Sequence, residues 1–264
     1  MKRLSVAAGF GVLLALLTTH SGCTSSSSRD SVPKVESAQA VGTSGAKNAA
    51  ADAFKAAAAQ ASAPLEGTGW QSMFDGATLK GWRETQFAGR GEVACSSGLL
   101  VLNMGDPFTG VNWTNDLPPM NYEIALDAMR VMGSDFFCGL TVPVGTNNCS
   151  LIVGGWGGSL VGISSLDDMD ASENETTKYV NFEQGHWYRI RLRVTPRRLE
   201  GWIDKDKLID VITKDKKISL RPGDIELSAP AGIASWQSAA ALRNIQWRAV
   251  EGPADPPKRD PLAP

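Results

Sequence analysis

Histidine is scarce in this chain, and its scarcity removes several kinds of catalytic site. Only two of the 264 residues are histidine, and His20 ends an apolar N-terminal segment. His186 remains, next to Trp187 at the expected start of a strand, where packing or exposure is the commoner role for an imidazole. A Ser–His–Asp triad and a histidine-based metal site are therefore not expected. Carboxylates are the better candidates for acid–base chemistry.

A strong excess of either charge is missing as well. The chain has 26 Lys and Arg residues against 28 Asp and Glu residues, which gives a net charge of −2 at pH 7. A nucleic-acid partner usually needs a basic patch, so no nucleic-acid partner is expected. The apolar residues 6–17 are too few to span a membrane comfortably as a mature helix, and no later segment is long and apolar enough to cross one.

The N-terminal residues are typical of an exported protein. Two basic residues precede the apolar residues 6–17, which predicts a signal peptide over residues 1–22. Ser21, Gly22 and Cys23 resemble a bacterial lipoprotein cleavage box, in which Cys23 becomes the lipidated N-terminus. We then expect a lipid anchor in the cell envelope, at the outer membrane or the periplasmic face. The alternative is an ordinary signal peptide that is cut near the same place.

Two further segments have too few bulky side chains to form a core. Residues 23–66 are rich in Ser and Ala, and residues 252–264 are rich in Pro. Such segments bury too little apolar surface to offset their ordering entropy, so the first is predicted to be a disordered tether and the second a disordered tail. The Ala run of the tether could form a transient helix. Residues 67–251 remain as one β domain.

Cysteine is also rare, with four residues in the whole chain. If Cys23 carries lipid, three remain, and at least one of them has no intrachain partner. Cys138 and Cys149 flank a predicted hairpin turn, but they would be out of register across it. We do not expect them to form a disulfide, and the spacing of Cys95 assigns it no partner.

Alternating apolar and polar residues indicate β-strands throughout residues 67–251. The clearest case is the segment 187–194, in which one side carries Tyr188, Ile190, Leu192 and Val194 and the other carries Trp187, Arg189, Arg191 and Arg193. The arginine row is either a solvent-facing sheet surface or a groove that tolerates an acidic glycan. Many short antiparallel strands without helical crossovers predict an all-β fold, a two-sheet sandwich or jelly roll.

Three segments resemble a known family, in the order in which that family has them. They are "MFDGATLKGW" (73–82), "GHWYRIRLRVTPRRLEGWID" (185–204) and "AGIASWQSAAALRNIQW" (231–247). They resemble the 3-keto-disaccharide hydrolase domain family. The resemblance implies a concanavalin A-like jelly-roll sandwich of two antiparallel sheets over residues 67–251.

The resemblance also implies an activity on glycosides whose C3 is already a ketone. The ketone acidifies the neighbouring C2–H, so a base can abstract that proton, the leaving sugar is eliminated and water then adds. Such a site needs a general base, a group that stabilises the enolate and a proton donor. The family usually has a His soon after the residue that matches Gln237, where this chain has Ser238, Ala239 and Ala240. A non-catalytic carbohydrate-binding or envelope interaction module on the same scaffold therefore remains the alternative, and a purely structural envelope protein is a third possibility.

The acidic segment "SSLDDMDASENETT" (164–177) has three interpretations. If it continues as a strand, Glu173 and Glu175 lie on one face with their Cα atoms about 6.6 Å apart, which suits a catalytic carboxylate pair. It could instead be a solvated loop. As a calcium loop it would use hard oxygen donors from Glu173 and from Asp167, Asp168 and Asp170. No other metal or cofactor is expected. Asp135 in "GSDFFCG" either faces the same hollow as a third catalytic candidate or is a turn residue.

Several tryptophans stand among polar or glycine residues, which is typical of sugar-binding faces. Indole rings stack on the C–H faces of sugars, while amides and carboxylates bind the hydroxyls. The candidates for contact with a carbohydrate ligand are Asn112, Trp113, Trp156, Trp236 and Gln237.

Overall fold

The computed structural model describes residues 38–251, with side chains from residue 49 onward. The predicted signal peptide, the lipidation site Cys23, the first part of the tether and the tail therefore lie outside the described residues. Within the described part, no helix is both long and apolar enough to cross a membrane.

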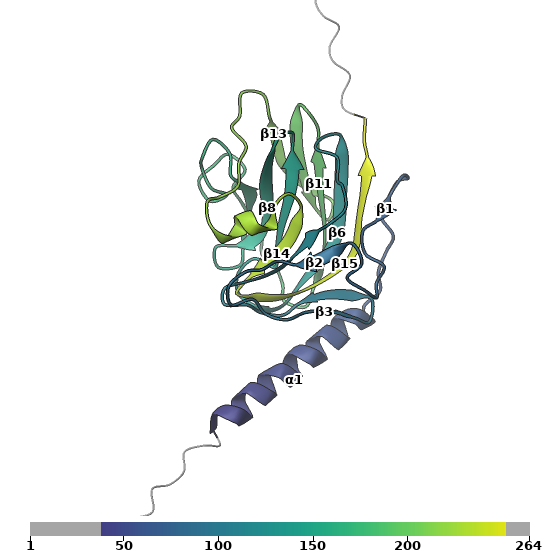
Figure 1. Cartoon of the computed structure of the whole chain (residues 1–264), viewed down its shortest axis with the longest axis vertical. Coiled ribbons are helices and arrows are strands. Elements are labelled where there is room, and N and C mark those ends of the chain that lie inside the picture. Colours follow the sequence, from purple (N-terminus) through teal and green to yellow (C-terminus); the bar gives the residue numbers. More distant parts are fainter. Residues whose placement is uncertain (1–37, 252–264) are drawn as a thin grey trace, which may run out of the picture. The chain divides into compact units, whose positions relative to one another are not determined.

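Two antiparallel sheets confirm the predicted sandwich (Figure 1). The eight-stranded sheet has, in spatial order, β13 (Asp206–Ile212), β12 (Arg198–Ile203), β11 (Trp187–Val194), β6 (Tyr122–Gly133), β15 (Ser238–Ala249), β4 (Leu99–Leu102) and β3 (Val93–Ser96), and β1 (Gln71–Ser72) pairs with β15. The seven-stranded sheet has β10 (Lys178–Tyr179), β9 (Leu160–Ser164), β8 (Asn147–Gly155), β7 (Cys138–Val144), β14 (Gly232–Trp236), β5 (Phe108–Trp113) and β2 (Trp82–Glu84).

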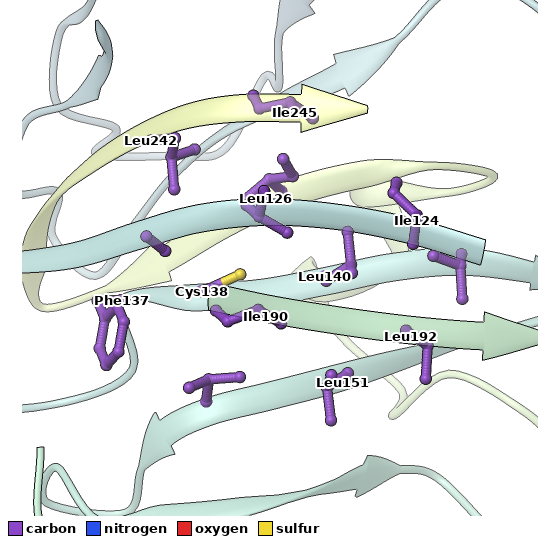
Figure 2. Packing of buried hydrophobic residues seen from close by; sticks show 14 of the residues in the cluster. Ile124, Leu126, Phe137, Cys138, Leu140, Leu151, Ile190, Leu192, Leu242 and Ile245 are labelled. Atoms are coloured by element: carbon purple, nitrogen blue, oxygen red, sulfur yellow. The ribbon is translucent and has the colours of Figure 1, made fainter. Parts of the chain in front are cut away.

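The main core lies between the two sheets, as Figure 2 shows. Ile190 and Leu192 of β11 are fully buried, whereas the residues between them are half-buried, which confirms the alternation predicted for this strand. Leu140 and Leu151 reach the same cluster from the seven-stranded sheet. Deleting a buried side chain of this size typically costs about 2–5 kcal/mol, so this cluster carries much of the stability of the fold.

The hairpin between β7 and β8 is also as predicted, and it keeps its cysteines apart. Cys138 lies opposite Val153 and Cys149 lies opposite Val142, so the two thiols are out of register. Both are free cysteines. Burial raises the pKa of each thiol to about 12, so neither is reactive at neutral pH.

One part of the predicted tether is wrong, because residues 38–59 form the helix α1 (Ala38–Ala59). Alanine has the strongest helix propensity, and its small side chain lets a helix approach a sheet closely. Ala57 is buried in a satellite cluster against Leu99 and Met129, and Phe54 packs beside it. These contacts supply the burial that the Ala-rich composition appeared to lack, since the sheet contributes the large side chains.

The last turn of α1 and the chain that follows it cross the outer face of the eight-stranded sheet as residues 57–68, which we call the strap. Side chains of the sheet bind its backbone carbonyls. Arg243 donates to the oxygens of Gln60 and Ala61 at 2.8 and 2.7 Å, and Arg189 donates to those of Ala63 and Pro64. Bonds from a charged donor are stronger than neutral ones, so these arginines hold the strap on the sheet.

The predicted arginine row therefore is neither a free solvent surface nor an open glycan groove. Arg189 forms an ion pair with the buried Asp127 at 2.8 Å. Arg191 and Arg193 pair with Glu123, whose side chain has no exposed surface, at 3.0 and 3.2 Å. The buried carboxylates orient the arginine side chains, and the backbone carbonyls of the strap accept hydrogen bonds from the remaining N–H groups of Arg189.

Candidate functional site

A cleft of about 500 Å³ lies over the outer face of the seven-stranded sheet. Outward side chains of β5, β8 and β14 form its floor, and the loops before β7, after β8 and before the short 3-10 helix η1 (Asp224–Ser228) form its rim. The residues that matter for chemistry are Asp135, Trp156, Asp170, Arg221 and Trp236.

The floor is aromatic because strand residues alternate between the core and this face. In β14, Ile233 points into the main core, whereas Ala234 and Trp236 belong to the outer side. The Trp236 ring meets Phe108 edge-on at 4.5 Å, and Phe136 lies 6.4 Å from Trp236. Trp236 is thus held rigidly with part of its ring exposed, as a stacking platform requires.

Trp156 stands on the rim, in the turn between β8 and β9. Its backbone has a φ of 49°, a left-handed conformation that is uncommon for a large residue, and its exposed fraction is 43%. Gly157 and Gly158 follow with φ values of 82° and 108°, so the turn depends on glycine there. The Arg221 guanidinium lies 6.0 Å from the indole centroid. A strained, exposed indole beside a cleft is typical of a ligand contact.

Asp135 lies in the loop between β6 and β7, and its carboxylate is fixed by two backbone donors. One oxygen accepts from the Phe136 N–H at 2.7 Å, and the other accepts from the Gly157 N–H at 3.0 Å. The Ser238 hydroxyl donates to the Asp135 carbonyl at 2.9 Å. The carboxylate lines the cleft and forms no ion pair with the side chains described, although the charge of the buried Arg130 acts on it.

Asp170 is the second carboxylate of the cleft, and it differs from Asp135 in being paired. It accepts from the Ser164 hydroxyl at 2.6 Å and from the Ala171 N–H at 2.7 Å. Arg221 forms an ion pair with its other oxygen at 2.8 Å. The Arg221 side chain is 59% exposed and that of Asp170 only 14%, so the cation faces the open cleft while the anion anchors it.

Glu173 and Glu175 do not line the cleft, and the segment does not continue as the strand that the catalytic-pair interpretation requires. The chain turns through residues 170–177, and β10 contains only Lys178 and Tyr179. The buried Asn174 between the two glutamates donates to the carbonyls of Ile163, Met169 and Asp170, which folds the segment back on β9. Both glutamates therefore point outward.

The rest of the acidic segment is neutralised by lysines of a neighbouring loop. Lys216 pairs with Asp167 at 3.0 Å and with Glu175 at 2.9 Å, and Lys217 pairs with Asp168 at 2.8 Å. The Lys217 N–H and Lys216 lower the pKa of Asp167. In the part of the chain that the structure describes, no three His, Cys, Asp or Glu side chains are grouped to hold a metal ion.

Three further candidates lie away from the cleft. Trp113 points into the main core and packs edge-on against Trp82 at 5.1 Å. Asn112 is buried and donates to the Leu227 carbonyl at 2.9 Å, so it supports η1. Gln237 is exposed and has a φ of 43°, but its side chain is not part of the cleft lining.

Sequence reasoning missed Arg221 and assigned Asp170 only to the calcium alternative. The segment 220–224, "LRPGD", places an arginine beside Pro and Gly, which is the signal of a rigid loop with a projecting cation. Nothing in the local sequence, however, connects Arg221 with Asp170.

Comparisons with known proteins bear on the whole domain. A family described as the 3-keto-alpha-glucoside-1,2-lyase-like domain matches residues 69–248. Among curated proteins, none matches the chain. Many solved structures are similar to it. A candidate glycosyl hydrolase from Parabacteroides distasonis has a TM-score of 0.47 and 16% identity, with 69% of this chain and 95% of that chain covered.

Two further similar structures come from Bacillus subtilis. The carbohydrate binding module CBM66 has a TM-score of 0.43 and 12% identity, and covers 64% of this chain and 96% of its own. A protein of unknown function with a galectin-like fold has a TM-score of 0.47 and 10% identity, and covers 66% of this chain and 92% of its own. At these scores the likeness says nothing about ligand or activity. The family match spans most of the chain, and the chain therefore belongs to the 3-keto-alpha-glucoside-1,2-lyase-like domain family.

Proposed function

We propose that the cleft over the seven-stranded sheet binds a saccharide and acts as a lyase on 3-keto glycosides. One observation carries the proposal: two indoles, Trp156 and Trp236, line one cleft with an unpaired carboxylate, Asp135, and a presented cation, Arg221. Indoles stack on sugar rings, and the two charged groups match the needs of a C2–H elimination. Membership of the family supplies the substrate class.

In the proposed reaction, the Asp135 carboxylate removes the proton from C2. The electron pair of the C2–H bond forms the enolate, whose oxygen develops negative charge that the Arg221 guanidinium stabilises. The C1–O bond then breaks, a C1=C2 double bond forms, and the leaving oxygen takes up the proton that Asp135 carries. Addition of water across the double bond would complete a net hydrolysis.

Asp170 serves this reaction indirectly. Its ion pair with Arg221 and its bonds from Ser164 and Ala171 hold the guanidinium in place beside Trp156. Because the Asp170 carboxylate is engaged by the Arg221 guanidinium, the base role is assigned to Asp135, whose carboxylate forms no such ion pair. The two carboxylates therefore take different roles, base and support.

The experiment is a turnover assay of the full chain with a 3-keto disaccharide and with its unoxidised parent. We expect elimination only from the 3-keto substrate, and Asp135→Asn to lower the rate about 10²- to 10⁴-fold. Asp168→Asn is the matched control, since Asp168 pairs with Lys217 away from the cleft. A wild-type rate in Asp135→Asn would remove the proposed mechanism.

Non-catalytic carbohydrate binding is the second candidate, and one observation favours it. His186, the one imidazole among the described residues, is exposed beside Tyr188 and is no part of the cleft lining. The cleft then lacks a histidine to move protons. Saturable binding of disaccharides without turnover of any of them would establish the module.

Export and anchoring form a separate part of the proposal. They are supported by the apolar residues 6–17 and by the Ser21-Gly22-Cys23 sequence. In a bacterial host, Cys23→Ser is expected to move the protein from the membrane fraction to the soluble exported fraction. Equal distribution of the variant and the parent would contradict the lipid anchor.

A further inference from the structure

Arg130 is a buried arginine that the proposed chemistry does not use. It lies on β6, with 7% of its surface exposed, and its guanidinium donates only to backbone carbonyls. The acceptors are the oxygens of Asp135 at 3.3 Å, Gly158 at 3.1 Å and Phe182 at 2.8 Å. These three residues belong to three different loops, so one side chain ties the loops together.

No acidic side chain among the described residues forms an ion pair with Arg130. The guanidinium lies 5.6 Å from the ring centroid of Phe137, and burial lowers the pKa of the arginine, against the opposing effect of the Asp135 charge. A buried charge without an ion-pair partner is costly unless hydrogen bonds satisfy it. The three carbonyls provide those bonds, and in return they are fixed in position.

Two of the three loops carry the cleft. Residues 133–137 hold Asp135, and residues 155–159 hold Trp156. The Gly157 N–H joins these loops by its bond to the Asp135 carboxylate, and Arg130 joins them by its bonds to the backbone carbonyls of Asp135 and Gly158. A Cβ on Gly158 would lie 2.8 Å from the guanidinium nitrogen, so this close approach requires the glycine.

We infer that Arg130 is a positioning residue, which fixes the carboxylate of Asp135 relative to the indole of Trp156. Its effect on ligand binding rests on the proposed function, whereas its hold on the two loops does not. A lysine at the same position would keep the charge but could not span carbonyls from three loops, because its donors share one nitrogen.

Hydrogen exchange of the full chain tests this inference without a ligand. In Arg130→Met, amide exchange in residues 133–137 and 155–159 is expected to rise at least about tenfold, and in Arg130→Lys to rise less. Arg243→Met is the matched control, because Arg243 is equally buried, at 8%, and belongs to the same sheet, but it binds the strap on the face away from the cleft. It should raise exchange in the strap and leave the cleft loops unchanged.

A ligand titration then separates the inference from the proposed function. If wild-type protein binds a 3-keto disaccharide, Arg130→Met should raise Kd about tenfold and Arg243→Met should not. If wild-type protein binds no saccharide, the proposed function fails, while the exchange experiment still decides the role of Arg130. Unchanged exchange in the cleft loops of Arg130→Met would overturn the inference. Should that variant not fold, unchanged exchange in Arg130→Lys overturns it equally.

Discussion

The two outer faces of the sandwich differ in what covers them. The face of the eight-stranded sheet carries buried carboxylates, Glu123 and Asp127, surrounded by arginines, and the strap lies across it. The face of the seven-stranded sheet carries Phe108, Phe136 and Trp236, and here the neighbouring loops leave a cleft open. The first face is occupied by the protein's own chain, and the second is available to a ligand.

The comparison shows that charge and cavity volume alone do not identify a binding site. A second hollow of about 500 Å³ lies beside the strap, lined by Arg189, Asp127 and Arg243 among others. Its main charges already satisfy each other or bind strap carbonyls. In the cleft, by contrast, no side chain among the described residues forms an ion pair with the Asp135 carboxylate, and 43% of Trp156 is exposed, with the Arg221 guanidinium 6.0 Å from its ring centroid. Side chains that can still bind a ligand therefore distinguish the face of the seven-stranded sheet, which we call the open face, from that of the eight-stranded sheet, which we call the closed face.

The largest effect on the free energy of unfolding is expected from breaking the ion-pair network of the closed face. Glu123→Gln leaves Arg191, Arg193 and Arg248 without their shared anion, which should lower the free energy of unfolding by about 3 kcal/mol. Saccharide affinity should not change, because Glu123 is far from the cleft lining. Urea unfolding and a ligand titration measure the two quantities.

The pH dependence of unfolding provides a control for this prediction. Burial raises the pKa of Glu123, but the bond from Arg248 and the charge of Arg193 outweigh burial and lower it below 4.5. The unfolded chain therefore binds more protons as the pH falls through this range, and the stabilisation present above pH 4.5 is lost below it. Glu123→Gln should lack this component. An identical acid-dependent loss in both proteins would contradict the assignment.

A smaller effect is expected from releasing the strap. Arg189→Met removes the donors to Ala63 and Pro64 and one partner of the buried Asp127, which keeps Arg243 and Asn244 beside it, so the free energy of unfolding should fall by about 2 kcal/mol. Exchange in residues 57–68 should increase, and exchange in the cleft loops should not. Faster exchange in the cleft loops would show that the two faces are coupled.

The open face should respond in affinity rather than in stability. Trp156→Ala removes an exposed indole, so we expect an unchanged midpoint of unfolding and a saccharide Kd raised about tenfold, measured by calorimetry. Trp202→Ala is the matched control on the closed face, where the ring lies under the Arg191 guanidinium at 4.5 Å. Equal affinity of Trp156→Ala and wild type would break the comparison.

The smallest effect is expected from the acidic segment. Glu175→Gln removes an exposed ion pair with Lys216, so stability should change by less than about 0.5 kcal/mol and affinity not at all. A tenfold loss of affinity or turnover would show that the acidic segment contributes to the binding site.

The sequence predicted the fold well because period-2 alternation and hairpin turns are local signals, as in β11 and in the β7–β8 hairpin. Trp156 was singled out because glycines flank it, and Asp135 because of its place in the family resemblance, and both line the cleft. Trp113 points into the core instead because β5 is buried on both faces and its two polar residues, Thr109 and Asn112, alternate between those faces, so polarity does not show which side is the core. Arg221 was not predicted as a site residue, because its ion pair with Asp170 forms only when two distant loops pack together. Sequence patterns thus predict elements, whereas cleft contacts between loops require the structure.

The most direct test of the account follows all eight tryptophans at once. The full chain, labelled with 5-fluorotryptophan, is titrated with a 3-keto disaccharide and with its parent, and each fluorine signal is assigned by a Trp→Phe variant. The account predicts that Trp156 and Trp236 shift in a saturable manner while Trp187 and Trp202 stay unchanged. Saturable shifts at Trp187 or Trp202, with Trp156 and Trp236 unmoved, would contradict it.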